Sequence, residues 1–444
     1  MWKRFGSIAI LFSVAVLVVP RVVHGIDVEG SFRLRYENSG ILGEQKYIRK
    51  EDIDHRVFSM RPVLAIYSND GAWELRAAPN IYYDTAYERV DIYNEQDKDE
   101  FSSYIDWRDT YVSHRGENNV LRVGRQVISW GKMDALRLAD RINPVNLERY
   151  LVPYLYDYEE GIQHVTAVSW DFFSAQSGFQ IVVVPEYQQS RLPSKNNRFS
   201  PYYAYRGYDI AADKKPDASQ PEYGFRYQKF IDDAELSFYF WEGYPDIPPI
   251  GILLDGNGHP RELAYHYGTE TYVGMSYSSI WQHKVLRFEV GMIHDSVLMM
   301  DQRRVSGSEE IQAFNKKRGL SFSDMYLAAA GVETELWSPA ARLIMQYYYE
   351  ELAKPDKPVY APLRRDGITF SFSQLLGDYD RYQLRFDGQY WTSDGSYLLR
   401  AGFRDQFLQH WQWNVELFQL VGDADTTFGM YEHSQYTFRL QYEI

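Results

Sequence analysis

The last residues of the chain, 436–444, alternate without a break between apolar and polar side chains. The apolar or aromatic set is Tyr436, Phe438, Leu440, Tyr442 and Ile444. Because successive side chains of a β-strand point to opposite faces, this segment predicts a strand with one apolar and one polar face. At the edge of a soluble sheet such a strand would leave its backbone groups unpaired, whereas in a membrane barrel it pairs with the first strand. The pattern therefore favours a closed transmembrane barrel.

The N-terminal segment has the three regions of a secretory signal peptide. Lys3 and Arg4 precede an apolar run over residues 8–19, and Val23-His24-Gly25 offers a cleavage site. The apolar run is too short to cross a bilayer as a helix, and Arg21 follows it too closely to favour an uncleaved anchor. We therefore expect a signal peptide over residues 1–25 and a barrel over residues 26–444.

Composition agrees with a barrel. The chain has 38 Tyr, 24 Phe and 11 Trp, yet its mean hydropathy is -0.46. A polar average with many aromatic residues is typical of strands that face lipid on one side and a polar lumen on the other. The absence of cysteine excludes disulfides and cysteine-ligated metals. A net charge of -14 argues against binding of nucleic acid and fits outward loops beneath which divalent cations bridge lipopolysaccharide.

Alternating segments recur along the whole mature chain and predict an all-β antiparallel barrel of about 18 strands. The connectors are alternately short, as at 68–71 and 116–119, and long, as at 187–221 and 297–322. Short turns of outer-membrane barrels lie in the periplasm and long loops lie outside the cell, so both termini are expected in the periplasm. A soluble sandwich or propeller would have many strands but would not explain this alternation of loop lengths.

Charged side chains fall on the polar faces of these strands. Because a guanidinium facing lipid is costly, we expect the charged side chains to line the lumen. The predicted pore-lining residues are Arg33, Arg35, Arg287, Arg342, Arg385, Asp387, Arg400, Arg404, Glu416 and Arg439. Several belong to the first and last strands, which are neighbours in a closed barrel, so they predict one basic sector. Two interpretations stay open: the arginines select anions, or they form ion pairs that brace the wall.

Residues 131–160 form a long connector with apolar and charged positions, which argues against disorder. We expect this connector to fold into the barrel mouth rather than to cap it from outside, with a short helix over residues 145–151 opened by Pro144. The residues expected at the constriction are Lys132, Asp134, Arg137, Asp140, Arg141, Asn143 and Arg149.

The run over residues 122–131 resembles the signature of an uncharacterised proteobacterial outer-membrane family, a domain of unknown function. The motif positions are Gly124, Arg125, Gln126, Trp130, Gly131 and Pro144. A second stretch, over residues 182–193, is similar to a later part of that family. The Gly-Arg-Gln hairpin also resembles alginate-export porins, which are eighteen-stranded with an arginine-rich pore. The resemblance covers residues 104–193 and implies an outer-membrane channel or transporter for a polymeric or lipid-like solute.

Catalytic motifs such as HExxH and Gly-x-Ser-x-Gly do not occur, so we expect neither an enzyme nor a metal or cofactor site. The function expected is a porin-like channel in the outer membrane of a Gram-negative bacterium, which passes an anionic or polymeric solute through an arginine-bearing lumen. The alternatives are a transporter of hydrophobic or lipid-like compounds and a non-conducting receptor or structural barrel. The expected partners are outer-membrane lipid, lipopolysaccharide, the small or polymeric solute and a periplasmic transport protein, but not nucleic acid.

Overall fold

The computed structural model describes residues 26–43, 47–134, 138–149, 158–211, 215–423, 426, 428 and 431–444. The predicted signal peptide lies outside these residues. Among the described residues, no helix is long and apolar enough to cross a membrane.

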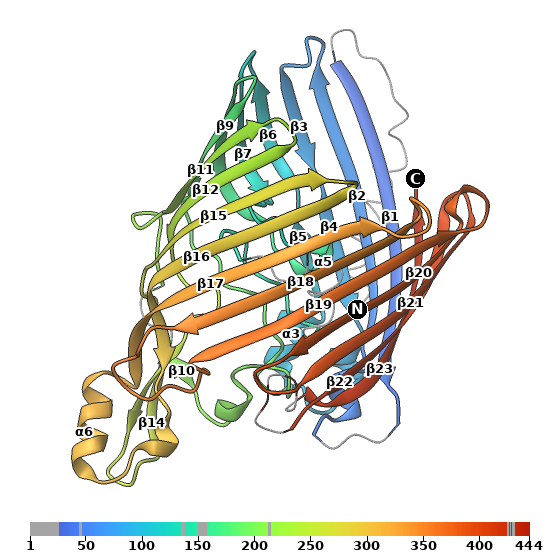
Figure 1. Ribbon diagram of the computed structural model, residues 1–444. Coiled ribbons are helices and arrows are strands. Elements are labelled where there is room, and N and C mark those ends of the chain that lie inside the picture. Colours follow the sequence, from blue (N-terminus) through green and yellow to red (C-terminus); the bar gives the residue numbers. More distant parts are fainter. Residues whose placement is uncertain are drawn as a thin grey trace.

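The described strands close into one antiparallel barrel (Figure 1). In chain order its segments are β1 Ile26–Ile41, β2 Arg56–Ser68, β3 Trp73–Ala77, β4 Pro79–Asp84, β5 Ser103–Trp107, β6 Thr110–Arg115, β7 Asn119–Gln126, β8 Val165–Phe173, β9 Ser177–Val184, β11 Glu222–Ile231, β12 Ala234–Gly243, β15 Glu270–Trp281, β16 Lys284–Met299, β17 Leu320–Glu335, β18 Ala341–Leu352, β19 Arg364–Leu376, β20 Tyr382–Trp391, β21 Tyr397–Leu408, β22 Trp411–Val421 and β23 His433–Glu443.

From β6 onward each segment pairs with the next one in this list, and β23 closes the barrel on β1, with Arg33 opposite Glu443 and Ile41 opposite Gln435. β3 and β4 both pair with β2 and together form one interrupted strand of the barrel. β5 pairs with β4 and β6 pairs with β3, so β5 and β6 together form the next interrupted strand. The twenty described segments therefore make the eighteen strands that the sequence predicts.

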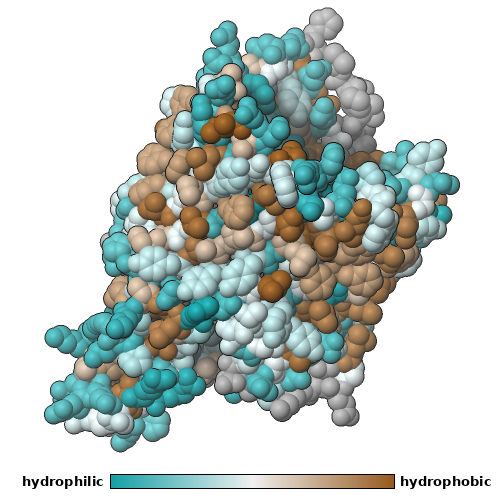
Figure 2. All heavy atoms as spheres, viewed as in Figure 1, coloured by the Kyte–Doolittle hydropathy of each residue, from teal (hydrophilic) through white to brown (hydrophobic). Residues whose placement is uncertain are grey.

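The two faces of the wall differ as strand alternation requires. In β15, Val273 and Met275 point outward and are 49% and 38% exposed, whereas Tyr272 and Ser276 point inward and are buried. Apolar residues accordingly spread over the strand wall in Figure 2. This outer surface suits lipid, and charged side chains in the middle of the strands, such as Glu289 and Arg400, are buried on the lumen side.

The connectors alternate in length as the sequence predicts. Residues 69–72, 116–118, 232–233 and 282–283 are tight turns at one end, and Ile26 and Glu443 lie at that same end. The long connectors at the other end carry helices α2 Ala86–Arg89, α3 Glu95–Phe101, α5 Tyr158–Gly161 and α6 Ser308–Lys316, and single 3-10 turns at Lys50–Asp52, Tyr203–Tyr205 and Gln302–Arg304. A further 3-10 turn, Asp378–Asp380, lies in a short connector.

A small three-stranded sheet, which the sequence analysis did not predict, forms among the long connectors. It consists of β10 Ile210–Ala211, β13 Ile250–Leu254 and β14 Pro260–Tyr265. Ile250, Ile252 and Phe314 of α6 are among the buried residues of its core. This unit protrudes beyond the barrel rim beside α6 (Figure 1, lower left).

Protease-site insertion tests the orientation of the barrel. Gly258 lies in the β13–β14 hairpin with open space around its α-carbon, and Asn118 lies in the short β6–β7 turn. A site inserted after Gly258 should be cleaved on intact cells, because long loops face outward, and one after Asn118 should be cleaved only in lysed cells. Cleavage at Asn118 on intact cells would show that the barrel is inverted.

Candidate functional site

The connector between β7 and β8 enters the barrel at once. Gly124 has φ +134°, and a Cβ there would lie 2.5 Å from the carbonyl oxygen of Thr110, so only glycine fits this close approach. β7 ends at Gln126, so the later motif residues Trp130 and Gly131 lie in the connector and not in the strand. Beyond it, the Asn143 side chain bonds the backbone N and O of Ile128 at 3.1 and 2.7 Å. These two hydrogen bonds hold together the two ends of a loop that folds into the lumen.

Asp140 stabilises the backbone turn at Trp130 and Gly131, inside this loop. Its Oδ1 accepts from the backbone N of Trp130 at 2.5 Å and of Gly131 at 2.7 Å. Trp130 is 1% exposed, stacks on Tyr239 with ring centroids 5.7 Å apart and donates from Nε1 to Gln180 at 2.6 Å. The motif residues Trp130 and Gly131 therefore anchor the loop in the lumen.

The loop packs on one half of the lumen wall. Met133, Leu138, Ala139 and Ile142 join a buried cluster with inward residues of β8, β9, β12 and β15–β18, among them Val182, Tyr239, Trp241, Tyr272, Ile293, Leu327 and Tyr348. The described part of the loop thus fills the apolar side of the barrel interior.

Polar residues of the loop pair with the same half of the wall. Lys132 Nζ lies 2.7 Å from Glu235, and Asp134 accepts from Arg287 and Gln346, each at 3.1 Å. Glu333 pairs with both Arg287 and Arg342. Arg287 and Arg342 therefore lie on the loop-filled side, away from the predicted basic sector. Arg137 lies outside the described residues.

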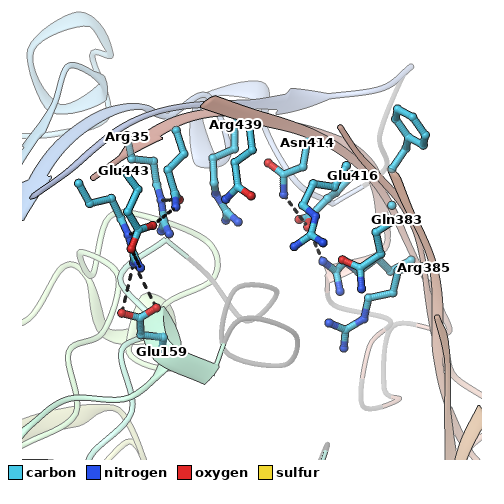
Figure 3. Close-up of a pocket in the computed structure, with 15 residues that line it drawn as sticks. Arg35, Glu159, Gln383, Arg385, Asn414, Glu416, Arg439 and Glu443 are labelled. Carbon is cyan, nitrogen blue, oxygen red and sulfur yellow. Dashed lines mark hydrogen bonds and ion pairs between the residues drawn. The ribbon is translucent and has the colours of Figure 1, made fainter. Parts of the chain in front are cut away.

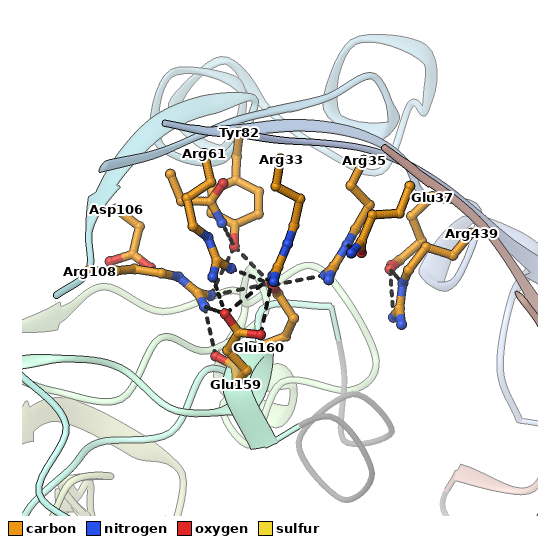
Figure 4. A network of polar contacts seen from close by, with 12 residues as sticks. Arg33, Arg35, Glu37, Arg61, Tyr82, Asp106, Arg108, Glu159, Glu160 and Arg439 are labelled. Atoms are coloured by element: carbon orange, nitrogen blue, oxygen red, sulfur yellow. Dashed lines mark hydrogen bonds and ion pairs between the residues drawn. The ribbon is translucent and has the colours of Figure 1, made fainter. Parts of the chain in front are cut away.

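The C-terminal end of the loop is the short helix α5, and a network of ion pairs around Glu159 and Glu160 attaches it to the wall (Figure 4). Glu160 is 3% exposed and lies 2.8 Å from Arg35, 3.2 Å from Arg61 and 3.3 Å from Arg108. Arg35 and Arg61 face its Oε1, and the Oε2 that faces Arg108 also accepts from the Tyr82 hydroxyl at 2.8 Å. Such a buried carboxylate, paired on several sides, fixes α5 against β1, β2, β4 and the β5–β6 junction.

Glu159 and Arg149 extend this network along the wall. Glu159 lies 3.2 Å from Arg33 and also pairs with Arg61. Arg149 lies 2.7 Å from Glu37, whose second oxygen lies 3.0 Å from Arg439. The loop thus meets the basic sector through charges, and the opposite side through apolar contacts together with ion pairs.

A polar cavity of about 350 Å³ remains between α5 and the wall of β1 and β20–β23 (Figure 3). Six arginines and three glutamates are among its lining residues: Arg33, Arg35, Arg385, Arg400, Arg404, Arg439, Glu159, Glu416 and Glu443. The structure therefore brings together seven of the ten predicted pore-lining residues, and Asp387 lies directly behind them.

Ion pairs take up part of this positive charge. Arg400 bonds Asp387 at 2.9 Å and also pairs with Glu416, and Arg439 pairs with Glu37. Arg385 pairs with Asp387 at 3.0 Å. Arg404 lies in no ion pair within 4 Å among the described residues. The bracing interpretation thus fits Arg400 and Arg439, whose side chains are 7% and 12% exposed. Arg385, whose side chain is 36% exposed, and Arg404 keep charge that faces the cavity.

The remaining predicted residues have structural places. Arg125 donates to the Trp107 carbonyl at 2.5 Å, and Gln126 donates to the Ala167 carbonyl at 3.0 Å. Arg141 lies 6.0 Å from the Tyr272 ring beside a separate cavity. Pro144 accepts from the backbone N of Gln163 at 2.8 Å.

The predicted helix over residues 145–151 is wrong over its described part. Val145 and Asn146 form β-bridges to Ile162 and Arg191, and residues 150–151 lie outside the described residues. Val145 N and Leu147 N find partners in Ser190 and Arg191, so the chain here is extended rather than coiled. Pro144 therefore ends the loop turn instead of opening a helix.

The sequence analysis missed Arg61, Arg108, Glu37 and Glu160. Arg61 lies opposite Arg33 in the β1–β2 register, so the strand alternation that predicts Arg33 in the lumen also predicts Arg61 there. Arg108 sits at the break between β5 and β6, and Glu160 in the connector, where parity gives no prediction.

Acid should loosen α5. Burial by itself would raise the pKa of Glu160, but Arg108, Arg35 and Arg149 outweigh burial and hold the pKa well below the ordinary 4.5. The stabilisation is therefore complete above 4.5 and is lost as the pH falls through the lower folded-state pKa. Single-channel conductance should stay constant from about pH 7 to about pH 5 and rise only in stronger acid. A rise that begins above about pH 6 would contradict this role of Glu160.

Comparison with known proteins gives a family and a fold. A family model described as "Protein of unknown function (DUF1302)" matches residues 37–405. Among curated proteins, none matches this sequence.

Solved structures of outer-membrane porins are similar in fold. OccAB3 of Acinetobacter baumannii has a TM-score of 0.52 at 11% identity, over 94% of this chain and 99% of that one. OccAB4 of the same organism has 0.53 at 9%, over 96% and 100%. OccK8 (OprE) of Pseudomonas aeruginosa has 0.52 at 8%, over 94% and 98%. The similarity to alginate-export porins stays a prediction.

Proposed function

Since this chain belongs to the DUF1302 family and shares its closed barrel with outer-membrane porins, we propose that it is an outer-membrane channel for small anionic solutes. The barrel has an apolar outer surface and eighteen strands, a size at which porins keep an aqueous channel. Its long loops would face outside a Gram-negative cell and its short turns the periplasm.

One observation carries the proposal: the in-folded loop leaves its free space on the arginine side. The loop covers the apolar half of the wall, so the cavity that remains is lined almost wholly by polar side chains. A route for hydrophobic compounds would need an apolar lining. The cavity volume of about 350 Å³ is near the lower end for ligand sites, which favours a small solute over a polymeric one.

We infer a negatively charged solute from the arginines whose charge faces the cavity. Arg385 and Arg404 come from adjacent strands, β20 and β21, and both line the cavity. Arg385 shares the carboxylate of Asp387 with Arg400, so this carboxylate does not cancel the charge of both arginines. Fixed cationic side chains in a narrow lumen favour anions.

Ion selectivity in planar bilayers tests this assignment. Arg385→Gln with Arg404→Gln should move the reversal potential in a salt gradient toward cations, because the double variant removes two guanidinium charges that face the cavity. Arg342→Gln, on the loop-filled side and paired with Glu333, is the matched control and should move it little. An unchanged anion preference in the double variant would mean that these arginines only brace the wall.

A further inference from the structure

A basic groove lies among the long connectors, and none of its lining residues lines the lumen cavity. It has a volume of about 580 Å³ and runs between residues 301–304, after β16, and residues 354–363, after β18. Its cations are Arg303, Arg304, Lys354 and Lys357, and its carboxylates are Asp301 and Asp356. The lining thus holds two more cations than carboxylates, although the whole chain has a net charge of -14.

The groove is built rather than a chance gathering of loop side chains. Met300 forms a β-bridge to Val359, and the Tyr360 N–H donates to the Met299 carbonyl at 3.2 Å. Pro355, Pro358 and Pro362 restrict the backbone of the second wall. Little ordering is therefore needed before a ligand binds.

The cations of the groove remain available to a ligand. Asp301 serves two arginines, with contacts of 2.8 Å to Arg303 and 3.4 Å to Arg304, and the arginine side chains are 73% and 70% exposed. Asp356 is engaged by Lys317 and by the Ser321 hydroxyl at 2.6 Å. For Lys354 and Lys357 no carboxylate lies within ion-pair distance among the described residues.

The position of the groove points to lipid headgroups. On β18 and β19 the outward face is apolar as far as Tyr347, opposite Ile368, and turns charged at Glu351, opposite Arg364. The second wall begins three residues after Glu351, and its last residue, Leu363, is 56% exposed. The groove therefore starts where the lipid-facing surface ends, at the long-loop end of the barrel. In Figure 2 hydrophilic residues gather over the unit of α6 and the small sheet, which protrudes at this long-loop end.

We propose that this groove binds the phosphate groups of lipopolysaccharide in the outer leaflet. Arginine and lysine side chains above an apolar surface match phosphates carried on a lipid, and clustered cations of this kind hold anionic lipids. The inference rests on the outer-membrane location proposed above but not on conduction.

Native mass spectrometry of the purified barrel in detergent tests the site, with bisphosphorylated lipid A as the probe. Lys354→Gln with Lys357→Gln should weaken lipid A binding about tenfold or more. Lys229→Gln with Lys284→Gln, at the short-turn end, removes the same charge and should leave binding unchanged. Dephosphorylated lipid A should bind the wild-type protein as weakly as the double variant binds lipid A. Heat-modifiable migration on gels confirms that every variant is folded.

Four results would overturn the proposal. Unchanged lipid A affinity in the Lys354/Lys357 variant, or an equal loss in the Lys229/Lys284 variant, would show that the groove is not the site. Equal binding of dephosphorylated lipid A would mean that acyl chains, not phosphates, are recognised. Inorganic pyrophosphate that binds as tightly as lipid A would make the groove a free-anion site. Conductance is measured separately, so failure of this proposal and failure of the channel proposal are distinguishable.

Discussion

Removal of the in-folded loop should raise single-channel conductance at least about twofold, since a barrel of this size without an occluding segment leaves a wide aqueous channel. The variant lacks residues 131–141, with the ends joined through two glycines. The excision is feasible because Asn143 bonds the backbone of Ile128, which places the two cut ends side by side. Planar-bilayer recording measures the change.

The matched control removes residues 256–258 from the β13–β14 hairpin, which lies outside the lumen. This variant should conduct like the wild type. Equal conductance in the loop-deleted and wild-type proteins would mean that the loop does not narrow the route.

Three carboxylates on the lipid face of β23 should abolish membrane insertion. Phe438, Leu440 and Tyr442 share the outward parity, opposite to buried Thr437 and Gln441. Each aspartate placed at these positions costs on the order of 1–3 kcal/mol in hydrocarbon, and together the three approach the whole stability of a domain. Heat-modifiable migration of outer-membrane fractions measures folded barrel.

Gln441→Asp is the lumen-facing control for this variant. Gln441 accepts from Arg35 at 3.1 Å, so a carboxylate there meets a guanidinium. It should therefore insert normally. Equal loss from both changes would show that the facing of β23 is wrong.

Strand number, loop parity and the facing of charges could be predicted because alternation repeats along the chain, and each strand reports independently on the same barrel. The basic sector followed from closure, which makes β1 and β23 neighbours and brings Arg35 beside Gln441. These predictions need only local pattern and one topological rule.

The lumen contents could not be predicted in the same way. Glu160 and Trp130 lie in a connector without periodicity, and their partners, Arg108 and Tyr239, are distant in the chain. Which arginines pair with carboxylates depends on register across several strands, as for Arg400 between Asp387 and Glu416. Strand parity also placed Arg287 and Arg342 in the lumen. It did not show that they lie on the loop-filled side, opposite the basic sector.

Single-channel recording of the purified wild-type protein in planar bilayers, under a salt gradient, tests the channel proposal most directly. We expect discrete conductance steps and a reversal potential of the sign that marks anion preference. Conduction would be contradicted if the protein shows no conductance steps, both as wild type and without residues 131–141, although heat-modifiable migration shows that both are folded. Discrete steps with cation preference would contradict the role given to Arg385 and Arg404.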